Sequence, residues 1–137
     1  MPTLTTQTEN NERGSATMFF IVLFVGLLLA IGLVVDGGAK TAGFQEARAV
    51  AESAARAAAG SIDGNSVAGG TPLVNPYAAQ AAAESYISAS GLSGGATVSG
   101  TTVTVTVTKT SPTIFLSAIG IRSLNSTATA TAQLLKQ

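Results

Sequence analysis

A run of uncharged residues near the N-terminus constrains this chain more than any other feature. From Gly14 to Val35 there are 22 residues without a charge, and from Met18 onward only two glycines interrupt Met, Phe, Ile, Val, Leu and Ala. At about 1.5 Å per residue, a helix of this length spans roughly 33 Å, enough to cross a bilayer core of about 30 Å. Because the run is apolar on every side, it is not an amphipathic soluble helix. We therefore predict a transmembrane helix over residues 14–36, with Asp36 as the charge at the membrane interface.

A cleaved secretory signal is the main alternative for the same run. Gly37-Gly38-Ala39 resembles a small-residue cleavage site. The apolar region would be unusually long, however, and the charges before it (Glu9, Glu12 and Arg13) sum to −1, whereas a signal peptide begins with a positive region. A core helix of a soluble protein fits less well still. The Lys and Arg content differs little on the two sides of the span, so it sets the orientation only weakly.

Composition excludes most catalytic chemistry. The 24 Ala, 18 Thr, 15 Gly and 13 Ser account for just over half of the 137 residues, His and Cys are absent, and the formal net charge is zero. The chain therefore lacks imidazole bases, thiol nucleophiles, the usual zinc ligands and the basic footprint of a nucleic-acid binder. The spacing of Ser111 and Lys109 is poor support for a dyad, and Asp36 with Glu46 or Glu52 suggests helix surface more than a cation site. We expect no enzymatic activity, cofactor, metal, nucleic acid or small-molecule substrate.

An alanine-rich segment over residues 37–60 predicts that the helix continues beyond the span. Small residues and one aromatic recur there at spacings of three and four, which defines one helix face: Phe44, Ala47, Ala51, Ala54 and Ala58. A face of alanine lets another helix approach closely, although alanine is also simply a good helix former. Gly37-Gly38 allows a kink or hinge, and Gly60 suits the end of the helix.

The remaining sequence predicts a small α+β domain over residues 61–137 and a disordered polar tail over residues 1–13. A glycine-rich loop (60–75) precedes Asn75-Pro76, an N-cap and first-turn proline for a helix over 77–89. Alternation of Val and Thr predicts a hairpin of 96–99 with 101–109, and alternation of Ala and Thr predicts a third strand over 126–135. The apolar segment 112–119 is either a short helix or a loop that covers the sheet.

The threonines of these strands share one face of the predicted antiparallel sheet. That face either is a solvated surface or binds a flat polar partner. The expected fold is therefore a long N-terminal helix, then one helix and a three-stranded antiparallel sheet.

The order of these segments resembles the TadE/TadG-like Flp pilus-assembly proteins of the tight-adherence system. The resemblance rests on the entry to the span, its exit and the alanine-rich helix: Glu12-Arg13-Gly14-Ser15, Val35-Asp36-Gly37-Gly38, Gln45-Glu46-Ala47-Arg48 and Ala49–Ala59. It continues toward the C-terminus in Val103–Lys109, Pro112-Thr113-Ile114-Phe115-Leu116, Gly120-Ile121 and Thr127-Ala128-Thr129-Ala130.

The resemblance implies a pilin-like, single-pass membrane protein with a cytoplasmic N-terminus and an extracytoplasmic α+β domain. It would act as a minor pilin or an assembly or anchoring component in adhesion and secretion-linked pilus biogenesis, with other pilin-like or Tad-type proteins as homo- or hetero-oligomeric partners. TadE-type members are cleaved after a glycine and carry Glu five residues later. Here Gly14-Ser15 is the candidate junction, but the fifth residue after it is Phe19, which favours the uncleaved, TadG-like form. The alternative function is a signal-anchored extracytoplasmic module that presents its Thr-rich sheet to a protein or cell-wall partner.

Overall fold

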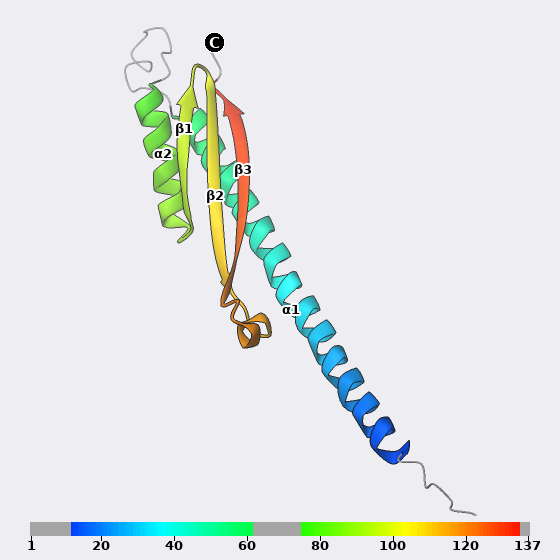
Figure 1. Cartoon of the computed structure of the whole chain (residues 1–137). Helices are drawn as coiled ribbons and strands as arrows, with labels where there is room; N and C mark the ends of the chain where they lie inside the picture. The colour runs from blue at the N-terminus through cyan, green and yellow to red at the C-terminus, as the bar shows by residue number, and fades with distance from the viewer. Residues whose placement is uncertain (1–11, 62–74, 135–137) are drawn as a thin grey trace, which may run out of the picture.

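The computed structural model describes residues 12–61 and 75–134. Its elements are helix α1 (Glu12–Ala59), helix α2 (Pro76–Ala89), strands β1 (Ser93–Ser99) and β2 (Thr102–Pro112), the 3-10 helix η2 (Leu116–Ile119) and strand β3 (Ser123–Gln133). The strands form one antiparallel sheet in the order β1-β2-β3 (Figure 1). The predicted α+β class, with a long apolar helix, one further helix and a three-stranded antiparallel sheet, is confirmed. Most of the predicted tail and of the predicted loop (1–11 and 62–74) lies outside the described residues.

Helix α1 joins the predicted span and the alanine-rich segment into one element of 48 residues. At about 1.5 Å per residue it is roughly 72 Å long. It passes through Gly37 and Gly38 without a break, and the Thr41 side chain donates a hydrogen bond to the Gly37 carbonyl oxygen at 3.0 Å. Figure 1 shows the N-terminal half projecting away from the rest of the chain, while the C-terminal half lies along the sheet. At the boundary predicted at residue 37 the helical backbone therefore continues, and only the surroundings of the helix change.

The sheet follows the alternation seen in the sequence. Val103, Val105 and Val107 are fully buried on the face that α1 and α2 cover, and the intervening threonines lie on the open face. The hairpin between β1 and β2 turns at Gly100, whose φ of 60° is the positive value required at the first central position of a type II′ turn. The predicted hairpin and third strand are thus present, with ends shifted by a few residues.

Alanine dominates the core between the helices and the sheet. Nine of the fourteen buried core residues are alanines, contributed by α1, α2, β1 and β3. Asn75 caps α2 as predicted, because its Oδ1 accepts from the Tyr77 N–H at 3.0 Å. Small side chains let the helix backbones lie close to the sheet, so a thin set of large apolar residues is enough to close the head, by which we mean residues 37–61 and 75–134.

Two segments differ from the sequence-based expectation. β1 begins at Ser93, three residues earlier than predicted, and includes Gly94, where an added Cβ would lie 2.3 Å from the Thr106 carbonyl oxygen. The glycines there serve a close approach of strands and do not only end the preceding helix. The apolar segment after β2 forms η2, which packs against α1 at the end of the sheet and does not cover the sheet face.

Candidate anchoring and docking surfaces

The N-terminal half of α1 presents its apolar side chains outward. Between Met18 and Val35 every large apolar residue is at least 42% exposed. Among the described residues, α1 is the one helix long and apolar enough to cross a membrane. A helix that is apolar all round is stable when lipid or another apolar surface covers it. We call residues 14–35 the apolar span; its surface fits a bilayer.

Asp36 ends the apolar span and is enclosed, although the residues before it are exposed. Its side chain is only 1% exposed. One carboxylate oxygen accepts from the Ile114 N–H at 3.0 Å, and the other accepts from Phe115 at 3.1 Å and Leu116 at 2.7 Å. These charge-assisted bonds satisfy N–H groups at the start of η2 that have no helical partner. Asp36, predicted as the charge at the membrane interface, is thus buried against the backbone between β2 and β3.

Gly32 lies one helical turn before Asp36 and receives Phe115 from the same loop. A Cβ built at Gly32 would lie 2.6 Å from the Phe115 Cβ, so only glycine allows this approach. Around this contact a small apolar cavity is lined from α1 and from the loop by Leu28, Leu29, Gly32, Leu33, Phe115, Leu116, Ala118 and Ile119. Sequence reasoning did not single out Gly32. The available signal was its spacing of four residues from Asp36, which places both on one helix face.

The predicted helix-packing face lies inside the head. Ala47, Ala51, Ala54 and Ala58 are 0% exposed and belong to the core formed with α2 and the sheet. The close approach that alanines permit is thus used by the chain's own elements. Phe44, the fifth residue of that face, is exposed. In the folded chain the four alanines of this face are therefore not accessible to another helix.

Polar contacts hold α1 against the sheet on the C-terminal side of Asp36. The Ser126 hydroxyl donates to the Lys40 carbonyl oxygen at 2.9 Å, and the Lys109 ammonium pairs with the Glu46 carboxylate at 2.9 Å. Gly43 lies opposite these strands, where an added Cβ would meet the Ser111 hydroxyl at 3.1 Å. The ion pair is partly exposed and contributes at most about 1 kcal/mol, so the close backbone packing does most to hold the helix.

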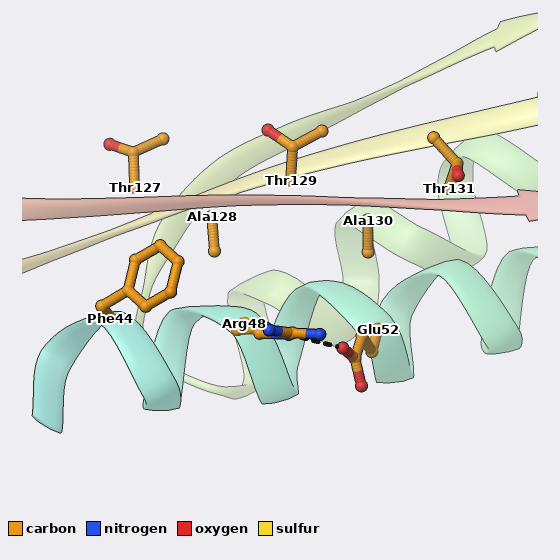
Figure 2. A pocket seen from close by; sticks show the side chains of 8 residues that line it. All are labelled: Phe44, Arg48, Glu52, Thr127, Ala128, Thr129, Ala130 and Thr131. Atoms are coloured by element: carbon orange, nitrogen blue, oxygen red, sulfur yellow. Dashed lines mark hydrogen bonds and ion pairs between the residues drawn. The ribbon is translucent and has the colours of Figure 1, made fainter. Parts of the chain in front are cut away.

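An open groove runs between α1 and strand β3, which is an edge of the sheet (Figure 2). Phe44, Arg48 and Glu52 line it from α1, and residues 127–131 line it from β3. Arg48 and Glu52 form an ion pair at 2.9 Å along the helix. Figure 2 shows Ala128 and Ala130 pointing toward α1, and Thr127, Thr129 and Thr131 pointing away from it. The groove combines a strand edge, an exposed aromatic ring and two charges, which suits contact with a protein segment.

The candidate processing junction lies in the first turn of α1. Gly14 and Ser15 are both exposed and helical, three residues or fewer from the start of the helix at Glu12.

Within residues 12–61 and 75–134, no three acidic side chains come together in a way that could hold a metal ion.

The threonines of β2 and β3 pair on the open face of the sheet. The Thr106–Thr129 and Thr108–Thr127 hydroxyl pairs hydrogen-bond there at 3.2 and 3.0 Å.

Together these features define a small α+β head carried on a helix that has the length and composition to span a membrane once. Residues 14–61 match the model of the Flp pilus-assembly TadE/G-like family. The matched segment contains the apolar span, Asp36 and the alanine-rich half of α1, and it confirms there the resemblance predicted from the sequence. No curated protein and no solved structure matches the chain.

Proposed function

We propose that this protein is a single-pass membrane protein that acts as a minor pilin or as an assembly or anchoring component of a Tad/Flp-type pilus. The observation that carries the proposal is the family match over residues 14–61. The exposed apolar span supports it, because such a surface suits a bilayer or another membrane helix. The N-terminus would face the cytoplasm and the head would lie outside, where it contacts other pilin-like or Tad-type proteins. No catalysis, metal or cofactor enters this role.

The geometry suggests how such a component would work. The same helix forms the anchor and the spine of the head, so a force on the head passes directly into the membrane segment. Asp36 fixes the β2–β3 loop to that helix at the place where the two parts meet. Because the alanine face is occupied, we assign partner contacts to the groove beside β3 and to the apolar span.

Piliation of a deletion strain tests the role. We expect loss or a strong reduction of surface Flp pili when the gene is deleted, and recovery on complementation with the wild-type chain. Immunoblots then distinguish the two forms of the proposal, because a minor pilin appears in sheared filaments and an anchoring component stays in the membrane fraction. Normal piliation of the deletion strain, together with no Tad-type protein crosslinked to the chain in membranes, would refute both.

The groove provides a sharper test of partner contact. A photo-crosslinking residue at Phe44, which is exposed on the groove, should capture a Tad-type protein or a second copy. The same residue at Tyr77, exposed on α2 away from the groove residues, is the matched control. Equal crosslinking from both positions would remove the groove from the proposal.

A second candidate function is a signal-anchored module that binds a protein or cell-wall partner through its sheet. The observation in its favour is the open, hydrogen-bonded threonine face. For this function, Thr106→Glu with Thr129→Glu should abolish retention of the detergent-solubilised chain on cell-wall sacculi. Retention unaffected by the two charges would exclude the face as a cell-wall site, and co-purified Tad proteins would favour the pilus role.

A further inference from the structure

The loop between β2 and β3 carries an apolar surface that the rest of the head lacks. Among the described residues outside the apolar span, seven large apolar residues are exposed, and four of them lie within this loop: Ile114, Phe115, Ile119 and Ile121. Ile114 is 70% exposed and Ile119 is 64% exposed. Residues 113–121 contain no charged side chain. An exposed apolar patch of this kind marks a site that contacts another apolar surface.

The position of the loop along α1 indicates what that surface is. The loop packs beside Leu28, Leu29, Gly32 and Leu33, all on the span side of Asp36. At about 1.5 Å per residue, Gly32 lies roughly 6 Å and Leu28 roughly 12 Å before Asp36 along the helix axis. Figure 1 shows η2 at the end of the sheet from which the apolar half of α1 projects. If those helix residues are in lipid, a segment packed against them enters the same layer.

Most backbone N–H groups of the loop are hydrogen-bonded within the protein, as a lipid environment requires. Irregular backbone is tolerated at membrane depth only when its polar groups are satisfied within the protein. Three consecutive N–H groups donate to Asp36, and four more donate to carbonyl oxygens within residues 113–122. The Thr113 and Ser117 hydroxyls also donate to loop carbonyl oxygens, those of Ile121 and Ile114. The loop therefore needs little water to satisfy its backbone.

Basic residues border the loop on the side of the head. Arg122 follows it directly and is exposed, and Lys40 lies one turn beyond Asp36 on α1, also exposed. Long basic side chains at the edge of an apolar surface reach lipid headgroups while their stems stay near the acyl chains. The order along α1 is thus the turns that contact the apolar loop, the buried carboxylate and the basic Lys40, as expected for a lipid interface.

We propose that residues 113–121 form a wedge that inserts into the bilayer leaflet nearer the head, beside α1, and seats the head on the lipid surface. The partner is the lipid itself. This proposal rests on α1 spanning the membrane, as in the proposed function, but not on a role in pilus assembly. The wedge would fix the tilt and rotation of the head relative to the membrane, because it adds a second point of insertion at a distance from the helix axis.

Single-cysteine labelling tests the wedge cleanly, because the chain has no native Cys. The full chain is reconstituted in vesicles of phosphatidylethanolamine and phosphatidylglycerol, with an environment-sensitive fluorophore on Ile114→Cys or Ile119→Cys. Val25→Cys in the middle of the span and Thr129→Cys on the open sheet are the reference positions. Lipids that carry a nitroxide near the headgroup or near the chain end report depth.

We expect the labels at positions 114 and 119 to lose most of their emission to the shallow nitroxide lipid. The label at position 25 should respond more to the deep one, and the label at position 129 to neither. If position 25 is quenched but the loop positions behave like position 129, the wedge is refuted while the anchor stands. Loop labels shielded from both the lipid and an aqueous quencher would also refute it, since a second chain would then cover the loop. No quenching at position 25 would refute the membrane anchor itself and the wedge with it.

Discussion

At the scale of single residues, two positions on one face of α1 decide how the head meets the apolar span. Asp36 supplies a charged acceptor for three backbone N–H groups, and Gly32 supplies the space for Phe115. Neither contributes to the alanine core. Both hold a loop that is about eighty residues away in sequence, so their roles are visible only once the chain is folded.

Replacement of Asp36 should loosen this loop. In Asp36→Ala the N–H groups of Ile114, Phe115 and Leu116 lose their acceptor, and their amide exchange should accelerate strongly, while Val105 in the central strand should not change. Asp36→Asn should give an intermediate rate, because it keeps one carbonyl oxygen but turns an NH₂ group toward a donor. Hydrogen exchange by mass spectrometry on the full chain in micelles is the measurement. Glu84→Ala on α2 is the control, and unchanged exchange of the loop in Asp36→Ala would contradict the assignment.

Gly32→Ala should displace Phe115, because the new methyl group would overlap its Cβ and ring. The matched control is Gly26→Ala, in the same helix, where nothing lies within 4 Å of the added methyl. We expect faster loop exchange and a lower unfolding temperature for the first variant only. Phe115→Ala in the Gly32→Ala background should show partial non-additivity, since it removes the clashing ring but keeps the Cβ that also clashes. Equal behaviour of the two glycine variants would indicate that Phe115 does not pack there.

At the scale of elements, the spacing of residue types in the sequence predicted which face of a helix or strand is buried, but not which element packs against that face. The alternation of Val and Thr identified the buried face of β2, and the three- and four-residue spacing of alanines identified the buried face of α1. What covers each face could not be read from the sequence, because an alanine stripe suits a partner's helix and an intramolecular sheet equally well. The loop after β2 was recognised as apolar, but its docking on the span was not predicted, because the spacing of Gly32 and Asp36 indicates a shared helix face and not what contacts it.

The alanine face of α1 should therefore govern folding of the head. Ala51→Leu places a larger side chain in a fully buried position between α1 and its neighbours, and we expect a loss of about 1–3 kcal/mol in stability. Ala49→Leu, on the exposed side of the same helix, should be close to neutral. Glu46→Ala removes one partly exposed ion pair and should cost less than about 1 kcal/mol. Thermal unfolding in detergent, followed by the circular dichroism of the sheet, separates the three; a neutral Ala51→Leu would contradict the packing described.

At the scale of the whole molecule, one helix serves two environments. Within the described part of the chain, the loop between β2 and β3 packs against the C-terminal end of its first half, and its second half is the spine of the head. The family match over residues 14–61 covers essentially all of α1 and therefore both of its halves. The open threonine face and the apolar loop lie outside the matched segment, whereas the groove beside β3 is lined partly from it, by Phe44, Arg48 and Glu52.

Retention of the N-terminal segment is the remaining prediction for the whole chain. The junction between Gly14 and Ser15 lies in the first turn of α1, and Phe19 stands where TadE-type members carry Glu. We expect the mass of the membrane-extracted protein to include the residues before Ser15. Phe19→Glu places the carboxylate five residues after the junction and should convert the chain into a peptidase substrate in the same cells. Phe20→Glu adds the same charge one residue later and should remain uncleaved. A wild-type chain that begins at Ser15 would contradict the uncleaved form, and equal processing of both variants would show that the position of the carboxylate does not matter.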